Sequence, residues 1–323
     1  MERRRFIRTV SGSLLGLAGA LALKGSGNSF LGEAKGGPIP KRPLGRTGEK
    51  LSIIALGGIV LSKETQETAD QYVREAIDHG INYFDVAPTY GDAQDRLGPA
   101  LKPFRKNVFL ACKTTQRDRQ GAEAELGHSL LTLQTDHLDL YQLHGLTKIE
   151  DVERAFGPDG AMEVFLKAKR EGKTRFLGFS AHSEEAALLA MDKFDFDTIL
   201  FPINFACMLK AGFGPRVIAR AREKKMGILA LKALARQKWP EEGMRKEYPK
   251  CWYQPITDPA EGALAFKFTL SQPVTAAVPP GDPRLFRRAL ELAHGFAPIG
   301  PEDEAKLRDL AAGLNPIFGQ KPA

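Results

Sequence analysis

From Leu51 onward the sequence repeats one pattern: a short apolar run, a turn, and an amphipathic helix. The apolar runs read LSIIALGG, YFDVAP, VFLACKT, HLDLYQLH, TRFLGFS, TILFPIN, GILALKAL and VTAAVP. Uninterrupted apolar strands are typical of a parallel sheet that is covered on both faces. The eight repeats of strand and helix predict an α/β fold of the (β/α)8 kind, a TIM barrel built as a single domain.

A doubly wound α/β sheet is the alternative architecture. That fold binds dinucleotides through a GxGxxG turn, and the nearest match here, KGSGNSF, lacks the third glycine. Two segments lie outside the repeat. Residues 301–313, PEDEAKLRDLAAG, predict an extra helix near the C-terminus. Residues 235–256 predict a long loop after the seventh strand, whose aromatic side chains either shape substrate choice or pack on the rim.

The first residues, MERRRFIRTVSGSLLGLAGALAL, place bases ahead of an apolar run that is too short to span a bilayer, which takes about 20 residues. The order RRRF at residues 3–6 resembles the twin-arginine signals, although Glu2 replaces the usual Ser or Thr. This resemblance implies passage through the twin-arginine export machinery after folding. We expect residues 1–35 to be an export signal and linker, residues 36–323 to be the barrel, and the mature protein to be periplasmic or otherwise exported.

Two other interpretations of the N-terminus stay open. The segment is also compatible with a basic amphipathic arm. It is equally compatible with a leader that no longer functions, on an enzyme that remains cytoplasmic.

The net charge of +7 does not indicate a nucleic-acid-binding protein. Residues 1–35 hold six bases and two acids, or +4, so the rest of the chain carries only +3. No cluster of Lys and Arg is interleaved with aromatic residues. The three cysteines, Cys112, Cys207 and Cys251, lack metal-ligand spacing, so we expect no metal site. One disulfide stays open for an exported protein.

Polar residues gather where the predicted strands end, which is where active sites of (β/α)8 barrels lie. The second strand ends at Asp85, with Tyr90 in the following loop, and the third and fourth end at Lys113 and His144. A buried charge is costly unless it is paired, so we expect Asp85 and Lys113 to form a buried pair. Alternation along the third strand directs Lys113 inward and Cys112 outward. The later strands end at Ser180 with His182, at Asn204, at Lys232, and in the turn that holds Gly281.

The segments FDVAPTYG, FLACKT and LDLYQLH resemble the aldo-keto reductase family, in which an Asp lies five residues before a Tyr, a Lys ends the next strand, and a His ends the one after. The resemblance runs from Pro43, in PLGRTGEKLSIIALGG, to Ala293, in VPPGDPRLFRRALELA. It implies an opening hairpin, a barrel, and reduction of a carbonyl compound by a nicotinamide dinucleotide, usually the 2′-phosphorylated form.

Carbonyl reduction needs a hydride donor at carbon and a proton donor at oxygen. No side chain supplies hydride, whereas Tyr90 can supply the proton. An adjacent ammonium lowers the pKa of a phenol from its reference value near 10 by about one to three units, so we expect Lys113 to lower the pKa of Tyr90. Asp85 would keep Lys113 charged, and His144 would hold the carbonyl oxygen or relay the proton. The resemblance implies the same roles.

We expect NADP(H), with NAD(H) as the alternative, at the helix start after the eighth strand. There Gly281 precedes Asp282, which can cap a helix, and a helix N-terminus binds anions. The candidate partners of the extra phosphate are Arg284, Arg287 and Arg288. A solvated basic helix face is the alternative interpretation of these arginines.

Two departures from the family pattern concern the nicotinamide. The family's Ser-Asn after the fifth strand is Ser180-Ala181 here, and its Gln on the sixth strand is Leu200. We therefore expect Ser180, His182 and Asn204 to share the contact with the ring, or the ring to be held more loosely. Lys232 would contact the pyrophosphate or be paired in the rim.

Three other functions are alternatives to a reductase. A nucleotide-binding barrel without catalysis, a sensor or partner-binding module, is favoured by Ala181 and Leu200. A Schiff-base lyase would use Lys113 or Lys232 as a nucleophile. A glycosidase needs two facing carboxylates, and Asp85 is the single carboxylate among the strand ends. Asp85, Tyr90 and His144 each also fit a purely structural role.

Overall fold

The computed structural model describes residues 38–319, which begin with an antiparallel hairpin of β1 (Lys41–Pro43) and β2 (Lys50–Ser52). Gly45 makes the turn at a φ of +52°, and a Cβ there would lie 2.2 Å from the amide nitrogen of Gly227. Only glycine fits so close to the neighbouring backbone. The hairpin that the resemblance implied is therefore confirmed. The expected export signal lies outside the described residues.

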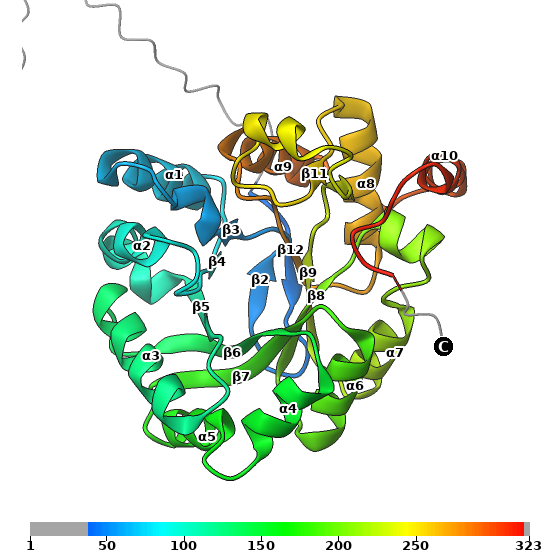
Figure 1. Ribbon diagram of the computed structural model, residues 1–323. Helices are drawn as coiled ribbons and strands as arrows, with labels where there is room; N and C mark the ends of the chain where they lie inside the picture. Colours follow the sequence, from blue (N-terminus) through cyan, green and yellow to red (C-terminus); the bar gives the residue numbers. More distant parts are fainter. Residues whose placement is uncertain (1–37, 320–323) are drawn as a thin grey trace, which may run out of the picture. The chain divides into compact units, whose positions relative to one another are not determined.

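Within residues 38–319, eight parallel strands form one sheet in the order β12-β9-β8-β7-β6-β5-β4-β3 (Figure 1). The sheet closes because Ala55 N donates to Ala277 O at 3.0 Å and Ala277 N donates to Ile53 O at 2.9 Å. The predicted (β/α)8 barrel is confirmed. The strands are β3 (Leu56–Gly57), β4 (Tyr83–Asp85), β5 (Phe109–Thr114), β6 (Leu138–Leu146), β7 (Thr174–Ala181), β8 (Thr198–Pro202), β9 (Gly227–Leu231) and β12 (Ala276–Val278).

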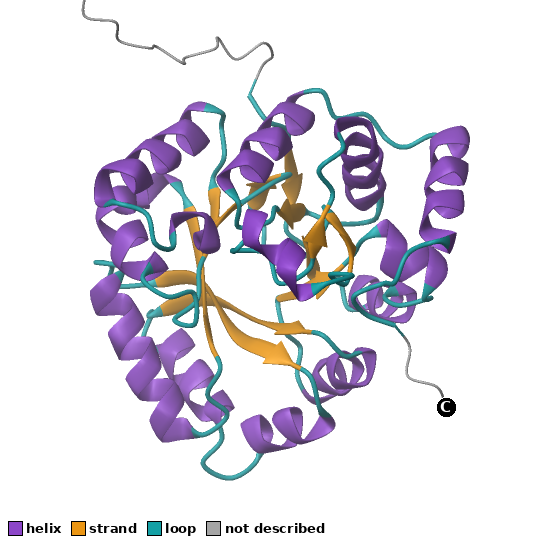
Figure 2. Cartoon of the chain, turned by 45° about the horizontal axis from the view of Figure 1, so that its top comes forward, coloured by secondary structure: helices purple, strands orange, loops and turns teal. Residues whose placement is uncertain are grey.

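Helices surround the strands (Figure 2), and several begin at a side-chain cap, such as Thr65, Asp118 and Ser183. Among the described residues, no helix combines the length and the apolar character needed to cross a membrane. The helices are α1 (Gln66–Asp78), α2 (Ala93–Leu101), α3 (Arg119–Thr132), α4 (Ile149–Phe156), α5 (Ala161–Arg170), α6 (Glu184–Lys193), α7 (Pro215–Glu223), α8 (Pro259–Ser271), α9 (Pro283–His294) and the predicted extra helix α10 (Pro301–Ala312).

The segment after β9, expected as a loop over 235–256, contains some regular structure. Short strands β10 (Ala235–Gln237) and β11 (Gln254–Pro255) pair at its base, and a 3-10 turn, η4 (Glu242–Glu247), lies between them. Other short helical turns are η1 (Gly58–Leu61), η2 (Lys102–Asn107) and the π-helical η3 (Ala206–Lys210).

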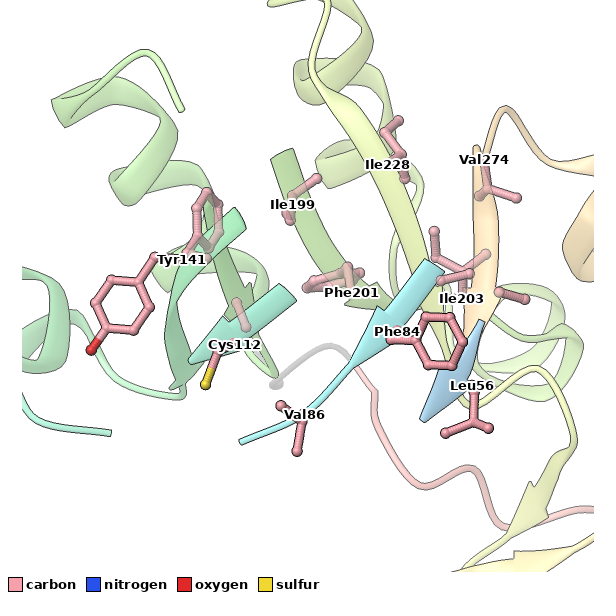
Figure 3. Packing of buried hydrophobic residues seen from close by; sticks show 14 of the residues in the cluster. Leu56, Phe84, Val86, Cys112, Tyr141, Ile199, Phe201, Ile203, Ile228 and Val274 are labelled. Carbon is pink, nitrogen blue, oxygen red and sulfur yellow. The ribbon is translucent and has the colours of Figure 1, made fainter. Parts of the chain in front are cut away.

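The core has one layer between sheet and helices and another inside the barrel. Phe84, Cys112 and Tyr141 belong to the outer layer (Figure 3). Phe109 and Ala111 belong to the inner layer. Since side chains alternate along β5, the inward face that carries Phe109 and Ala111 also carries Lys113, as predicted.

Candidate active site

Asp85 and Lys113 form a buried ion pair at the carboxyl ends of β4 and β5. The Lys113 Nζ contacts Asp85 Oδ1 and also donates to the Val86 carbonyl at 3.2 Å, and the two side chains are 0% and 1% exposed. Burial is the largest single effect and lowers the pKa of Lys113, but the charge and hydrogen bond of Asp85 together with the nearby Tyr90 raise it by more, so the net pKa lies above the ordinary value. Lys113 is therefore a charged ammonium at neutral pH, as the sequence predicted.

Tyr90 follows β4 in a turn closed by its own amide, which donates to the Ala87 carbonyl at 3.1 Å. The Lys113 Nζ lies 5.2 Å from the centroid of the Tyr90 ring. Burial raises the pKa of Tyr90, and the charge and hydrogen bond of Lys113 lower it by less, so the net pKa is raised. The expected net lowering is therefore wrong in sign, because sequence spacing shows the ammonium but not the loss of solvent.

His144, at the end of β6, packs its ring edge-to-face against Tyr90 with centroids 5.7 Å apart. Its Nδ1 lies 3.4 Å from Thr89 Oγ1. Burial, with the nearby charge of Lys113, lowers the pKa of His144 to about 3. The imidazole is therefore neutral at physiological pH, which suits it to donating a hydrogen bond rather than to carrying a charge.

Two further side chains hold the ion pair, and the sequence analysis missed both. Tyr83 OH donates to Asp85 Oδ2 at 3.2 Å, and Gln142 Nε2 reaches the same oxygen at 3.4 Å. Each stands two residues before a site residue on the same strand, so each shares its inward face. The alternation of side chains along each strand, with a period of two residues, is the sequence signal that would have identified both residues.

At the ends of β7 and β8, some polar side-chain atoms already form hydrogen bonds within the protein and others do not. Ser180 Oγ accepts from Gly145 N at 2.8 Å, so this hydroxyl orders the turn after His144. Asn204 Oδ1 accepts from Cys207 N at 2.9 Å. His182 stacks on Phe318 with centroids 5.1 Å apart, and burial, with Lys232, lowers its pKa to about 4. The buried His182 Nε2 and Asn204 Nδ2 have no hydrogen-bond partner.

Lys232 follows β9 with a φ of +69° and has no carboxylate partner among the described residues. Its ammonium instead lies 5.3 Å from the ring centroid of Trp252 and 5.0 Å from that of Tyr253. Burial lowers its pKa to about 8. Among the described residues, Lys232 therefore pairs with aromatic rings and not with a carboxylate.

At the start of α9 the backbone is crowded and the arginines are paired. A Cβ at Gly281 would lie 2.0 Å from Ile59 Cγ2, and Asp282 caps the helix by accepting from Arg284 N. Each arginine also contacts a carboxylate: Arg284 contacts Asp282 at 2.9 Å, Arg287 contacts Glu75 at 2.9 Å, and Arg288 contacts Glu291 at 3.6 Å. The helix start exists as predicted, but a nucleotide phosphate would compete with these carboxylates.

A nicotinamide dinucleotide fits part of this set. The unpartnered Asn204 Nδ2 is a donor for an amide or phosphate oxygen, and His182 Nε2 can also serve as a hydrogen-bonding group. Ala181 and Leu200, at the two departures from the family pattern, are fully buried and apolar, so neither can contribute a hydrogen bond. Among residues 38–319, no group of three or more His, Cys, Asp or Glu is arranged to hold a metal ion. All three cysteines are free thiols.

The fold and the site together define the class: a (β/α)8 barrel that carries a buried Asp–Lys pair beside a tyrosine and a histidine at its carboxyl end. Residues 54–251 match the model of the aldo/keto reductase family, and the chain belongs to this family of NAD(P)-dependent oxidoreductases. Asp85, Tyr90, Lys113 and His144 all fall inside the matched segment.

Individual relatives agree with this assignment. The chain is 30% identical over 200 residues to aldo-keto reductase YhdN of Bacillus subtilis, covering 56% of each protein. It is 26% identical over 238 residues to L-galactose dehydrogenase of Arabidopsis thaliana, covering 65% of this chain and 70% of that protein. The matched part spans 48% and 56% of the length of two Bacillus subtilis relatives, about half.

Solved structures show the same fold. The holo form of an aldo-keto reductase from Bacillus halodurans superposes with a TM-score of 0.65 at 23% identity, covering 85% of this chain and 98% of that one. At this identity the likeness shows the fold alone.

Proposed function

We propose that this protein transfers hydride between a nicotinamide dinucleotide, NADP(H) in preference to NAD(H), and a carbonyl or alcohol substrate. The observation that carries the proposal is the convergence of Tyr90, His144 and the buried Asp85–Lys113 pair at one end of the barrel. The dinucleotide would supply the hydride, and the protein would supply the proton and the binding contacts.

The neutral imidazole of His144 donates a hydrogen bond to the carbonyl oxygen and so fixes its position beside the Tyr90 hydroxyl. Tyr90 delivers its proton to that oxygen as negative charge develops there. The Lys113 ammonium stabilises the phenolate that remains. Asp85 holds the ammonium in place, and Tyr83 and Gln142 in turn hold the Asp85 carboxylate.

His182 and Asn204 are the proposed contacts of the dinucleotide near its reacting ring, with Ser180 ordering the turn between them and His144. Gly281 and the start of α9 would receive its phosphates. Arg288 is the proposed partner of the extra phosphate, because the carboxylate that it contacts within the described part of the chain, Glu291, is exposed and 3.6 Å away. Arg284 and Arg287 would have to exchange closer partners.

The experiment that tests the catalytic assignment is the substitution Tyr90→Phe. It removes the acidic hydroxyl and keeps the ring that packs on His144. We expect turnover to fall about 10²–10⁴-fold, while fluorescence titration shows the dinucleotide bound nearly as well as before. Turnover close to that of the unchanged enzyme would remove Tyr90 from the mechanism.

A second candidate function is a barrel that keeps a dinucleotide without catalysis. The buried apolar side chains of Ala181 and Leu200 favour it, because they leave the nicotinamide amide with fewer partners. The two functions separate in one assay: a non-catalytic barrel binds the dinucleotide but leaves its absorbance unchanged with every aldehyde and ketone offered.

A Schiff-base lyase is the less favoured alternative. Lys113 is held as a charged ammonium, which is a poor nucleophile, whereas burial lowers the pKa of Lys232 to about 8. Borohydride treatment in the presence of substrate would leave a covalent adduct on Lys232 if a lyase operates. Absence of the adduct is expected of a reductase.

We further propose export through the twin-arginine pathway to the periplasm, on the strength of the RRRF order and the short apolar run that follows. A cytoplasmic location with a silent leader is the alternative.

A further inference from the structure

Burial is the largest cause of the lowered pKa of His144, and the positive charges of Lys113, Arg117 and Lys232 lower it further. Lys113 is paired with Asp85. Arg117 lies 3.7 Å from Asp151 and donates to the His144 carbonyl at 2.7 Å. Lys232 has only the faces of two aromatic rings. The end of the barrel that holds Tyr90 therefore carries one positive charge that the described residues do not neutralise.

The surroundings of Lys232 compensate its charge only in part. The side chain is half-buried, and removing an ammonium from water is costly unless an anion or a set of hydrogen bonds replaces the water. Cation–π contact with Trp252 and Tyr253 compensates part of that cost. It also positions the ammonium, since the two rings restrict where the flexible side chain can lie.

Two buried polar atoms in the same region also lack partners. They are His182 Nε2 and Asn204 Nδ2, and the charge of Lys232 acts on His182 as well as on His144. Asn204 Nδ2 and His182 Nε2 are the proposed contacts of the dinucleotide, so the group that still lacks a partner is the Lys232 ammonium, which favours a negatively charged oxygen ligand.

We propose that the substrate reduced at this site carries a carboxylate that pairs with Lys232, an inference that rests on the proposed reductase function. Lys232 directly follows β9 at the carboxyl end of the barrel, the same end at which His144 lies on β6 and orients the reacting carbonyl, so the acidic group would lie on the same small molecule as that carbonyl. The substrate class is therefore an aldehyde or ketone acid. A neutral carbonyl compound would leave the ammonium unpaired, and the site would discriminate against it.

The test compares two aldehydes of nearly equal shape, 4-carboxybenzaldehyde and methyl 4-formylbenzoate. We expect the unchanged enzyme to prefer the acid in kcat/KM, and Lys232→Met to lower the acid-to-ester ratio by about tenfold or more, since a lost charge-assisted contact is worth that much. Lys232→Arg should keep most of the preference because it keeps the charge. Lys238→Met, which changes an exposed lysine of the same segment, is the matched control and should keep the ratio unchanged.

The nucleotide pyrophosphate is the other anion that Lys232 could receive, and the same variants separate the two. If Lys232→Met weakens dinucleotide binding and leaves the acid-to-ester ratio unchanged, the proposal is overturned in favour of the pyrophosphate. If neither aldehyde is reduced by the unchanged enzyme, the reductase function fails. Calorimetry then measures the binding of 4-carboxybenzaldehyde to the unchanged protein and to Lys232→Met. Binding that is lost in the variant supports the anion site, and equal binding to both proteins overturns it.

Discussion

Tyr90 is the residue at which two opposing physical effects meet. Burial makes its phenolate less favourable, and the Lys113 ammonium makes it more favourable, with burial the larger of the two. The ammonium is useful only while it stays charged in a dry site, and Asp85 is what keeps it charged. The proton donor, the lysine and the aspartate thus act as one unit.

That unit predicts different outcomes for single and paired substitutions. Lys113→Met alone leaves Asp85 buried without its counter-ion, which costs about 3–5 kcal/mol of folding stability. We expect the double variant Asp85→Asn, Lys113→Met to fold, because both charges are gone, but to lose about 10²–10⁴-fold in turnover. Thermal unfolding and steady-state kinetics measure the two effects. Removing the exposed pair Glu123 and Lys167, 2.7 Å apart, is the control. Turnover of the double variant within tenfold of the unchanged enzyme would exclude Lys113 from proton transfer.

The buried histidines make folding stability depend on pH. The pKa values of His144 and His182 are lowered to about 3 and about 4, whereas an unfolded chain protonates histidine near pH 6.5. Below about pH 6.5 the unfolded state therefore binds more protons than the folded state, so stability is intact above that pH and is lost progressively down to about pH 3. We expect the variant His144→Gln, His182→Gln to lose less stability over this range in urea unfolding. His128→Gln, at an exposed helix position, should follow the unchanged protein. Parallel curves for all three proteins would contradict the assignment.

At the scale of elements, the segment after β9 is fastened to two distant parts of the barrel. Lys250 Nζ donates to the Val60 carbonyl and to Glu64 Oε1, each at 2.8 Å. On the other side Arg284 donates to the Glu247 carbonyl at 2.9 Å and lies 4.3 Å from the Tyr248 ring centroid. These contacts hold a segment that carries the two aromatic neighbours of Lys232.

We expect Lys250→Met to release this segment without unfolding the barrel, because both Lys250 contacts are lost while the core is untouched. Amide hydrogen exchange, followed by mass spectrometry, should become faster in peptides from η4 to β11 and stay unchanged in β4 to β6. Lys246→Met, an exposed lysine in the same segment, is the matched control. Unchanged exchange in Lys250→Met would show that the other contacts of the segment hold it without Lys250.

The elements themselves were readable from the sequence because each strand is an uninterrupted apolar run, which only a sheet covered on both faces explains. The strand ends followed from the same pattern, and with them Asp85, Lys113 and His144. The sequence did not show which side chains contact the charged and titratable groups of the site. Glu75 meets Arg287 from α1, and Phe318 meets His182 from beyond α10, so both contacts depend on how distant segments fold together. Solvent exclusion at Tyr90, which reversed the expected pKa direction, has the same origin.

At the scale of the whole molecule, a reductase sent out of the cytoplasm is separated from the cell's supply of reduced dinucleotide. One arrangement reconciles export with hydride transfer: the dinucleotide binds before export and stays bound, being reduced by one substrate and oxidised by the next. The twin-arginine pathway carries folded proteins, so it allows such loading. The barrel must then be complete, with its dinucleotide in place, before the leader is used.

This arrangement predicts the location and the mass of the protein together. We expect the unchanged protein to be recovered from the periplasm with one dinucleotide per chain in native mass spectrometry. The variant Arg3→Lys, Arg4→Lys should stay in the cytoplasm, because it removes the arginine pair on which the resemblance to a twin-arginine signal rests. Arg8→Lys, in the same basic region but outside the pair, should be exported normally. Export of the double variant would disprove the signal assignment. Periplasmic protein without dinucleotide would disprove loading before export, because hydride transfer would then need reduced dinucleotide that the compartment provides by another route.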